Sequence, residues 1–153
     1  MLYNILVIRN GASKRRGAEV RNMELEKIRE RFSEDLYAVE ATGITITEAH
    51  DCHSVCELTL GRRHKNAMGG VMGGVVFTLC DYAFAVASNG LDKPYSMTIS
   101  STVTFLSQPG SDRLVAEAVC IKDGGHTCFY RVNVTDGNGA AVAEALFTGY
   151  KLK

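Results

Sequence analysis

Asp81 is the residue of this sequence whose type and surroundings point most clearly to chemistry. It is the only charged side chain in an apolar stretch, residues 73–88, that contains no proline. A carboxylate in such surroundings loses hydration, which is costly unless it has partners or a function. Carboxylates of this kind often serve as general bases or nucleophiles. We therefore predict that Asp81 is catalytic; a structural aspartate that pairs with an arginine or caps a neighbour is the alternative.

Two glycine pairs, Gly69-Gly70 and Gly73-Gly74, precede this stretch. Glycine lets a backbone approach a ligand closely, and the first turn of a helix carries N–H groups without intrahelical partners. The helix dipole adds partial positive charge at the same end. The segment at Gly73 therefore predicts an oxyanion or phosphate site, where one well-directed donor is worth roughly 3 to 4 kcal/mol. Glycines that merely permit tight packing are the alternative.

The spacing of Gly73 and Asp81 indicates that the two do not act together within one chain. Eight residues of helix span about 12 Å, too far for Asp81 to reach a carbonyl held at the start of its own helix. Two such helices side by side in a symmetric dimer would bring Asp81 of one subunit to Gly73 of the other. The spacing favours an active site shared between subunits.

A second group of ligand-type residues comprises His50, Cys52, His53 and Cys56. No second pair follows at zinc-finger spacing, and alternating strand geometry would send these side chains to different faces. We expect no metal site and interpret them as hairpin residues. Other nucleophilic arrangements do not assemble, since the sequence has no Gly-x-Ser-x-Gly elbow and no phosphate-binding Gly-x-x-x-x-Gly-Lys loop, and the neighbours of Cys80 are apolar rather than activating.

The elements that position these residues follow from the spacing of apolar side chains. An amphipathic helix is expected over residues 23–32, a hairpin from strands at 43–48 and 55–60, and a buried helix over 73–88. After Pro94 the pattern becomes β-rich, with turn signals between the stretches. The expected strands are 97–106, 114–121, 128–135 and 141–150. We interpret these four as a meander and the whole as an α+β fold, an antiparallel sheet wrapped around the buried helix.

Composition limits the class of protein. A chain of 153 residues with 46% hydrophobic side chains fits one soluble globular domain. Lys plus Arg and Asp plus Glu each number 17, a zero net charge that argues against a nucleic-acid partner. The apolar residues 1–8 are too short to span a bilayer. Five cysteines without a secretory segment indicate reduced thiols and a cytoplasmic protein.

Residues 1–22 fit poorly with the rest, because a short apolar run is followed by a basic, polar one. We hypothesise that they are a non-native N-terminal extension, that translation naturally begins at Met23, and that residues 23–153 form the single domain. Intact mass of protein from its native source tests this, and a mass that includes Met1 contradicts it.

The sequence also resembles a known family. Its matching positions are Asn66, Gly69, Gly73-Gly74, Leu79, Asp81 and Ala83, followed by a strand ending Thr104-Phe105-Leu106. This pattern is similar to the signature of hotdog-fold acyl-CoA thioesterases of the phenylacetic-acid-degradation (PaaI-like) type. The similarity covers roughly residues 23–150, essentially the whole expected domain.

The resemblance implies hydrolysis of a small aryl- or medium-chain acyl-CoA to free acid and CoA. It implies a homo-oligomer, a dimer or a dimer of dimers, that needs no metal or redox cofactor. Asp81 would act from the facing subunit as general base or nucleophile, and the Gly73 N–H would polarise the thioester carbonyl. Asn66 would position substrate or water, and Thr98 would hold the water or the carboxylate.

The resemblance implies further substrate-binding positions. Met72 and Gly74 flank the glycine expected to bind the carbonyl. The segment Gly125-His126-Thr127 falls where the family often contacts the nucleotide portion of CoA, a plain hairpin turn being the alternative. The basic segment from Arg62 to Lys65, which includes His64, either is solvated surface or touches CoA phosphates. Aromatic residues for an apolar substrate tunnel, with ordinary core as the alternative, are Phe77, Tyr82, Phe84 and Phe105.

Met72 departs from the family pattern, which commonly has a histidine directly before the glycine pair. A thioether cannot donate a hydrogen bond. Three outcomes stay open: Asn66 is oriented differently and activity survives, the rate is lowered, or the protein binds acyl-CoA without hydrolysing it. The rivals to a thioesterase are therefore a non-catalytic acyl-CoA sensor and, less well supported, a hotdog hydratase or dehydratase. The latter would need an Asp/His pair near the helix, and residues 73–88 contain no histidine.

Overall fold

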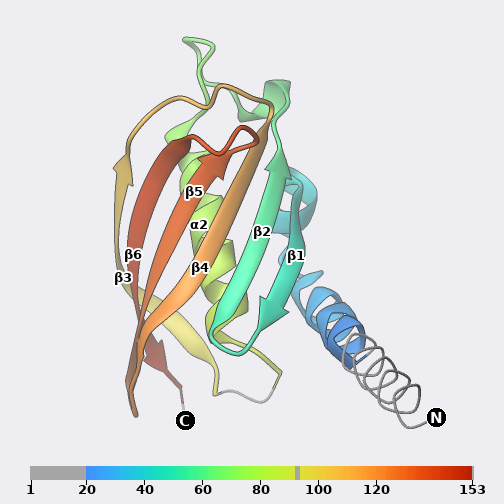
Figure 1. Cartoon of the computed structure of the whole chain (residues 1–153), viewed down its shortest axis with the longest axis vertical. Helices are drawn as coiled ribbons and strands as arrows, with labels where there is room; N and C mark the ends of the chain where they lie inside the picture. The colour runs from blue at the N-terminus through green and yellow to red at the C-terminus, as the bar shows by residue number, and fades with distance from the viewer. Residues whose placement is uncertain (1–19, 92–93, 153) are drawn as a thin grey trace, which may run out of the picture.

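A six-stranded antiparallel sheet curves around one helix, α2 (Gly73–Ser88), as Figure 1 shows. This computed structural model describes residues 20–91 and 94–152. The strands are β1 (Ile44–His50), β2 (His53–Thr59), β3 (Ser96–Phe105), β4 (Arg113–Asp123), β5 (Thr127–Asp136) and β6 (Ala141–Lys151). The α+β hotdog architecture expected from the sequence is confirmed, and the expected boundaries agree with the observed ones within a few residues.

The helix α2 forms the centre of the core because it is apolar on most of its circumference. Leu79, Cys80 and Ala83 are fully buried against the concave face of the sheet. The aromatic rings that pack there stack closely: Phe84 lies 5.1 Å from Phe147, nearly parallel, and 5.3 Å from Tyr130, edge to face. The face of α2 that the described residues leave at least partly exposed carries Gly74, Phe77, Thr78, Asp81 and Ala85.

Asn89 ends α2 and fixes where β3 begins. Its backbone N–H donates to the Ala85 carbonyl and completes the last turn of the helix. Its side chain accepts a 2.6 Å hydrogen bond from the Ser96 N–H and donates a 3.1 Å bond to the Ser96 carbonyl. Asn89 is buried, and both of these bonds hold the first residue of β3 against the end of α2. This contact sets how β3 runs along the helix.

The position of β3 corrects the expectation of a four-strand meander. The strand order is β1-β2-β4-β5-β6-β3, so β4, β5 and β6 form a meander while β3 pairs with β6 at the edge. The connection at residues 106–112 crosses the end of the sheet to reach β4 (Figure 1). These seven residues, when extended, reach about 23 Å. That is enough to connect β3 to β4, which lie three strand spacings or roughly 14 Å apart. A sequence pattern gives strand boundaries but not strand neighbours.

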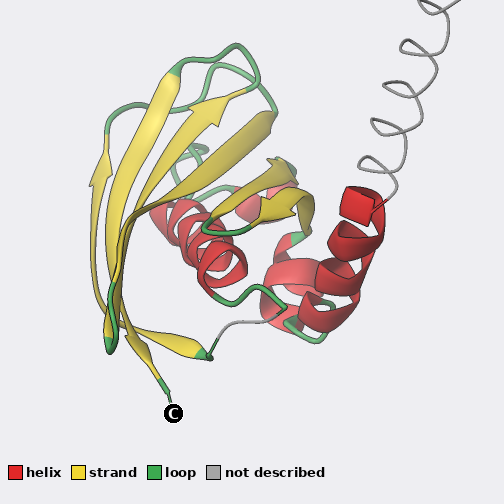
Figure 2. Cartoon of the chain, turned by 60° about the horizontal axis from the view of Figure 1, so that its bottom comes forward, coloured by secondary structure: helices red, strands yellow, loops and turns green. Residues whose placement is uncertain are grey.

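Two helical segments pack beside the sheet on the side of β1 (Figure 2). The helix expected over residues 23–32 is confirmed, and its described part covers residues 20–32. A π-helical turn, η1 (Tyr37–Thr42), follows and was not anticipated. Residues 1–19 lie outside the described residues, so the proposed extension over 1–22 stays a prediction. Within the described chain, no helix combines the length and apolar character needed to cross a membrane.

Gly149 in β6 provides a test of the core. A Cβ atom at this buried position would lie 2.8 Å from both Phe84 Cζ and Cys128 Sγ. We expect Gly149→Ala to lower the free energy of unfolding by about 1 to 3 kcal/mol through overpacking. Gly61→Ala is the matched control, since a Cβ there meets nothing within 4 Å. Urea denaturation measures both, and equal stability of the two variants would contradict the packing described.

Candidate active site

Asp81 is held from β3 by Thr98. The Thr98 hydroxyl donates a 3.0 Å hydrogen bond to Asp81 Oδ1. Both side chains are partly buried, and Asp81 lies on the face of α2 that the sheet does not cover. The structure therefore brings together two residues for which the family resemblance implied a joint role.

Burial raises the pKa of Asp81 above its ordinary value, because the charged form loses hydration. The hydrogen bond from Thr98 lowers the pKa, and the negative charge of Asp35 raises it. A raised pKa means that the carboxylate is a stronger base than a solvated aspartate. It also means that ionisation of Asp81 costs stability: the cost is absent below the unfolded-state pKa, grows as pH rises from there through the folded-state pKa, and is constant above it.

A β-bulge in β3 serves two parts of the site. Thr98 pairs with Gly149 and Ser100 with Thr148, so Ile99 between them has no partner. In an unbroken strand, residues 98 and 105 would point to opposite faces because their separation is odd. The extra residue changes this parity, so that both Thr98 and Phe105 face α2, one at Asp81 and the other at Gly73.

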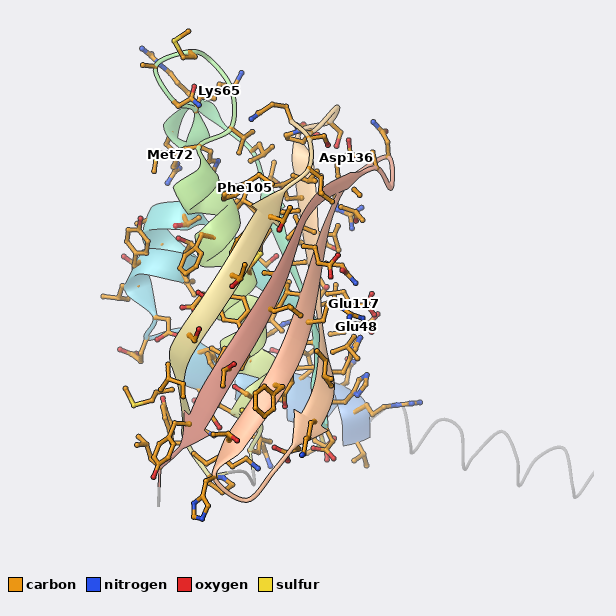
Figure 3. The ribbon with its side chains drawn as sticks, turned by 90° about the vertical axis from the view of Figure 1, so that its left-hand side faces the viewer. Glu48, Lys65, Met72, Phe105, Glu117 and Asp136 are labelled. Carbon is orange, nitrogen blue, oxygen red and sulfur yellow. The ribbon has the colours of Figure 1, made fainter. Side chains whose placement is uncertain are left out.

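The N-terminus of α2 is lined closely by two side chains. A Cβ atom at Gly73 would lie 3.2 Å from the Phe105 ring, and one at Gly74 would lie 2.9 Å from the Met72 methyl carbon. The N-cap residue, Met72, makes no side-chain capping hydrogen bond to the helix. Met72 and Phe105 both lie at the end of the sheet where α2 begins (Figure 3). The glycines thus let two apolar side chains rest directly on the first turn.

The loop before α2 is held by Asn66 and Gln108. Asn66 Oδ1 accepts hydrogen bonds from the N–H groups of Met68 (3.0 Å) and Gly70 (3.1 Å). Gln108 Oε1 accepts a 2.8 Å bond from the Val71 N–H. In this structure the carbonyl end of Asn66 therefore shapes the loop, which leaves its amide NH₂ for a ligand. Sequence reasoning missed Gln108, which stood in a turn beside Pro109 and carried no signal beyond its polarity.

Asn66 and Gly73 share a cavity of about 240 Å³ at this end of the helix. Phe105, Ser107 and Gln108 line it as well, whereas Asp81 and Thr98 do not. The predicted catalytic residues thus form two separate groups within one chain, Asn66 with Gly73 and Asp81 with Thr98. The separation along the helix that the sequence indicated is present in the structure.

The predicted CoA-contacting segment lies at the other end of the sheet. Gly125, His126 and Thr127 form the turn from β4 to β5, closed by a 2.9 Å hydrogen bond from the Gly124 N–H to the Thr127 carbonyl. His126 is exposed. Because β4 runs away from the end where α2 begins, this turn is remote from Gly73 in the same chain (Figure 1). One chain does not bring it to the carbonyl site.

Three further candidates turn out to be structural. His64 is buried: its Nδ1 accepts from the Gly61 N–H (2.8 Å), so Nε2 carries the proton and donates to the Thr42 carbonyl (2.8 Å). It is therefore not available to CoA phosphates. Tyr82 and Phe84 are buried in the core, which leaves Phe77 and Phe105, both partly exposed, as candidates for an apolar substrate surface.

The positions of His50 and His53 correct the expectation that their side chains point to different faces of the sheet. His50 and His53 pair across the β1–β2 turn, so they share a face of the sheet, and their rings stack at 4.4 Å. Alternation within one strand does not apply, because the turn separates the two residues. Cys56 is buried on the opposite, helix-facing side.

Comparison with known proteins shows the family to which this chain belongs. Residues 68–143 match the model of the Thioesterase superfamily. The chain is 33% identical over 118 residues to the Deinococcus radiodurans protein named "Putative esterase", covering 77% of this chain and 80% of that protein. It is 27% identical over 129 residues to an Archaeoglobus fulgidus protein of the same name, covering 84% and 83%. The chain belongs to the thioesterase superfamily, a class of thioester hydrolases.

Solved structures place the chain within that class. A mutant of the phenylacetic acid degradation protein PaaI from Thermus thermophilus is 28% identical, with a TM-score of 0.69 over 74% of this chain and 97% of that one. A hypothetical thioesterase from Streptococcus pneumoniae, solved with coenzyme A, is 24% identical with a TM-score of 0.73, covering 79% and 96%. The fold is that of the PaaI-type hotdog thioesterases.

The contact between Thr98 and Asp81 gives a testable pH effect. Thr98→Val removes the hydrogen bond that lowers the pKa of Asp81, so this pKa should rise further. Titration of ¹³C-labelled aspartate carboxyls by NMR measures the shift. Thr102→Val, the same change at an exposed position of β3, is the matched control and should leave the Asp81 titration unchanged. A Thr98→Val titration that coincides with wild type would disprove the contact.

Proposed function

We propose that the protein hydrolyses acyl-CoA thioesters at sites shared between two subunits, with Asp81 as the base that activates water. The observation that carries the proposal is the position of Asp81: its carboxyl is partly desolvated, is hydrogen-bonded to Thr98 and lies on the stripe of α2 beside the β3 edge that the sheet does not cover. Asn66 and Gly73, on a separate cavity of the same chain, supply the complementary half.

The edge of the sheet supports the dimer. β3 is an edge strand, so one row of its backbone hydrogen-bonding groups has no strand partner within residues 20–91 and 94–152. Met97 and Ile99 on this strand are 51% and 56% exposed, and Phe77 on the uncovered face of α2 is 39% exposed. A two-fold axis at this edge would pair β3 with its copy and set the two α2 helices antiparallel. Asp81 would then approach the partner's Gly73. A dimer of dimers extends the same proposal.

The chemistry follows from this pairing. A water molecule held at Asp81 attacks the thioester carbon while its proton passes to the carboxylate. The Gly73 N–H at the start of the partner helix stabilises the negative charge that develops on the carbonyl oxygen. Collapse of the tetrahedral intermediate breaks the C–S bond, and the leaving CoA sulfur takes up the proton that Asp81 accepted, which regenerates the carboxylate. The products are the free acid and CoA, and no metal or redox cofactor takes part in the proposed steps.

The CoA portion has candidate contacts at the same end of the proposed dimer. An antiparallel pairing of β3 strands places the β4–β5 turn of one subunit, with Gly125, His126 and Thr127, at the end where the partner's α2 begins. Arg62, Arg63 and Lys65 are exposed there as partners for phosphates. That this fold accommodates the ligand is supported by structures solved with coenzyme A and, from Streptococcus mutans, with acetyl-CoA.

The acyl group would lie along the two partly exposed rings, Phe77 and Phe105. These favour a small aryl- or medium-chain acyl group over a charged one, because burying apolar surface against them is favourable. A cytoplasmic location accompanies this proposal: all five cysteines are free thiols, as expected for a reducing compartment.

Substitution of Asp81 tests the mechanism. We expect Asp81→Asn to lower kcat for acyl-CoA hydrolysis by about 10²- to 10⁴-fold, because the amide cannot accept the proton. Its stability at neutral pH should equal or exceed that of wild type, since the neutral amide avoids the desolvation cost of the carboxylate. Glu144→Gln, at an exposed position of β6, removes one charge elsewhere and serves as control. Hydrolysis unchanged in Asp81→Asn would refute the mechanism.

Mixed dimers test whether the site is shared. Gly73→Val should block the carbonyl site, and Asp81→Asn removes the base, so each pure variant should be inactive. After subunit exchange, half of the dimers contain one intact site, and activity should return to about a quarter of wild type. If Asp81 and Gly73 acted within one chain, mixing would restore nothing. Circular dichroism of each variant confirms that it is folded before mixing.

The second candidate function is binding of acyl-CoA without catalysis. It is favoured by Met72, which stands where the family commonly has a histidine. Its thioether methyl carbon rests on Gly74 and donates no hydrogen bond. Calorimetric binding and steady-state hydrolysis of short, medium and aryl acyl-CoAs separate the two functions. Turnover supports the hydrolase, whereas binding of acyl-CoA without turnover supports the sensor.

A further inference from the structure

A group of metal-ligand side chains lies at the edge of the sheet opposite β3. One potential ligand atom each from Glu48, His50 and His53 lies within 4.8 Å of the others. Glu48 and His50 alternate along β1, and His53 pairs with His50 across the turn, so the three share one face. Ser54 and Cys56, the alternate side chains of β2, are buried toward α2. The group is therefore on the outer face, away from the proposed active site.

The ring of His53 is oriented by a carboxylate from a third strand. Its Nε2 lies 2.9 Å from Glu117 Oε1 on β4. Because the carboxylate only accepts hydrogen bonds, Nε2 carries the proton, and Nδ1 of the neutral ring keeps its lone pair. That Nδ1 atom is buried and has no hydrogen-bond partner among the residues that the structure describes. A buried nitrogen left without a partner is costly, which is an independent sign that something is missing there.

This arrangement matches the way proteins hold metal-binding histidines. A ligating imidazole nearly always donates its other N–H to a carboxylate or carbonyl, which fixes the ring and makes it a better ligand. Glu117 is the carboxylate that accepts this hydrogen bond from His53. Figure 3 shows Glu117 and Glu48 on the same side of the sheet. Two imidazoles and a carboxylate are ligands suited to zinc and neighbouring divalent transition metals, not to calcium or magnesium.

We propose that Glu48, His50 and His53 bind a divalent transition-metal ion such as zinc, with Glu117 as the positioning residue for His53. Ligand atoms of a tetrahedral zinc ion lie about 3.3 Å apart, so the three ligand atoms, now within 4.8 Å of one another, must move closer by side-chain rotation. His50 moves most: its ring now stacks on His53 at an interplanar angle of 14°, and an ion must lie in the plane of each ring it binds. His50 is exposed and free to turn. The ion would join β1 to β2 beside their turn and stabilise this hairpin.

The experiment uses the full chain without a histidine tag, stripped of metal with EDTA. Isothermal titration with Zn²⁺ should give one ion per chain, and Co²⁺ should give visible absorption bands characteristic of nitrogen and oxygen ligands. Zn²⁺ should also raise the melting temperature, because the ion binds only the folded hairpin. Absence of Zn²⁺ binding to the wild type would overturn the proposal.

Variants identify the ligands. His50→Ala, at an exposed position, and His53→Gln, which keeps a donor for Glu117, should both abolish binding and the thermal shift. His126→Ala removes an exposed histidine of the β4–β5 turn that is not part of the group, and should leave metal binding unchanged. Glu117→Gln should weaken binding about 10- to 100-fold without removing a ligand. If both His50→Ala and His53→Gln still bind Zn²⁺, the ion is bound elsewhere, for example by cysteine thiols, and the proposed site is wrong.

Discussion

The structure depends on the burial of α2 in the concave face of the sheet. A helix that is apolar almost all round must be covered on most sides, and β2, β4, β5 and β6 cover it with residues such as Tyr130 and Phe147 that have almost no exposed surface. The sheet bends around the helix but does not close, so one stripe of α2 remains uncovered. Asp81 lies on that stripe, which is why a carboxylate is tolerated in this helix at all: one side of it is desolvated and the other is accessible.

The same constraint determines where reactants can bind. Since the sheet covers most of the helix, access to α2 is restricted to the side of β3 and to the helix N-terminus. Asn89 ties the start of β3 to the end of α2, and the bulge at Ile99 turns both Thr98 and Phe105 toward the helix. The strand β3 therefore contacts α2 at two points that lie eight residues apart along the helix: Thr98 at Asp81 and Phe105 at Gly73. Neither point holds all the predicted catalytic residues, and this is the physical basis for the proposal of a shared site.

The two edges of the sheet differ in character. The β3 edge carries exposed apolar side chains and is covered by no helix or strand of the described part of the chain, as expected of a surface that meets another chain. The β1 edge carries Glu48 and His50, and charged or polar residues on an edge strand oppose edge-to-edge association. The histidine group therefore lies where dimerisation through β3 would leave it accessible, and any ion bound there would act on the hairpin rather than on the thioester.

The sequence by itself determined the elements and the identity of the central residues. Apolar periodicity and turn signals are local properties, so the bounds of α2 and of the strands could be predicted, and Asp81 stood out as the lone charge of an apolar helix. The contact of Thr98 with Asp81 was anticipated only through the family resemblance. The tertiary structure decided what depends on residues distant in sequence: the place of β3 beside β6, the bulge at Ile99, the role of Gln108, the burial of His64 and the shared face of His50 and His53. These follow from strand pairing and packing between elements, interactions that no local pattern of side chains encodes.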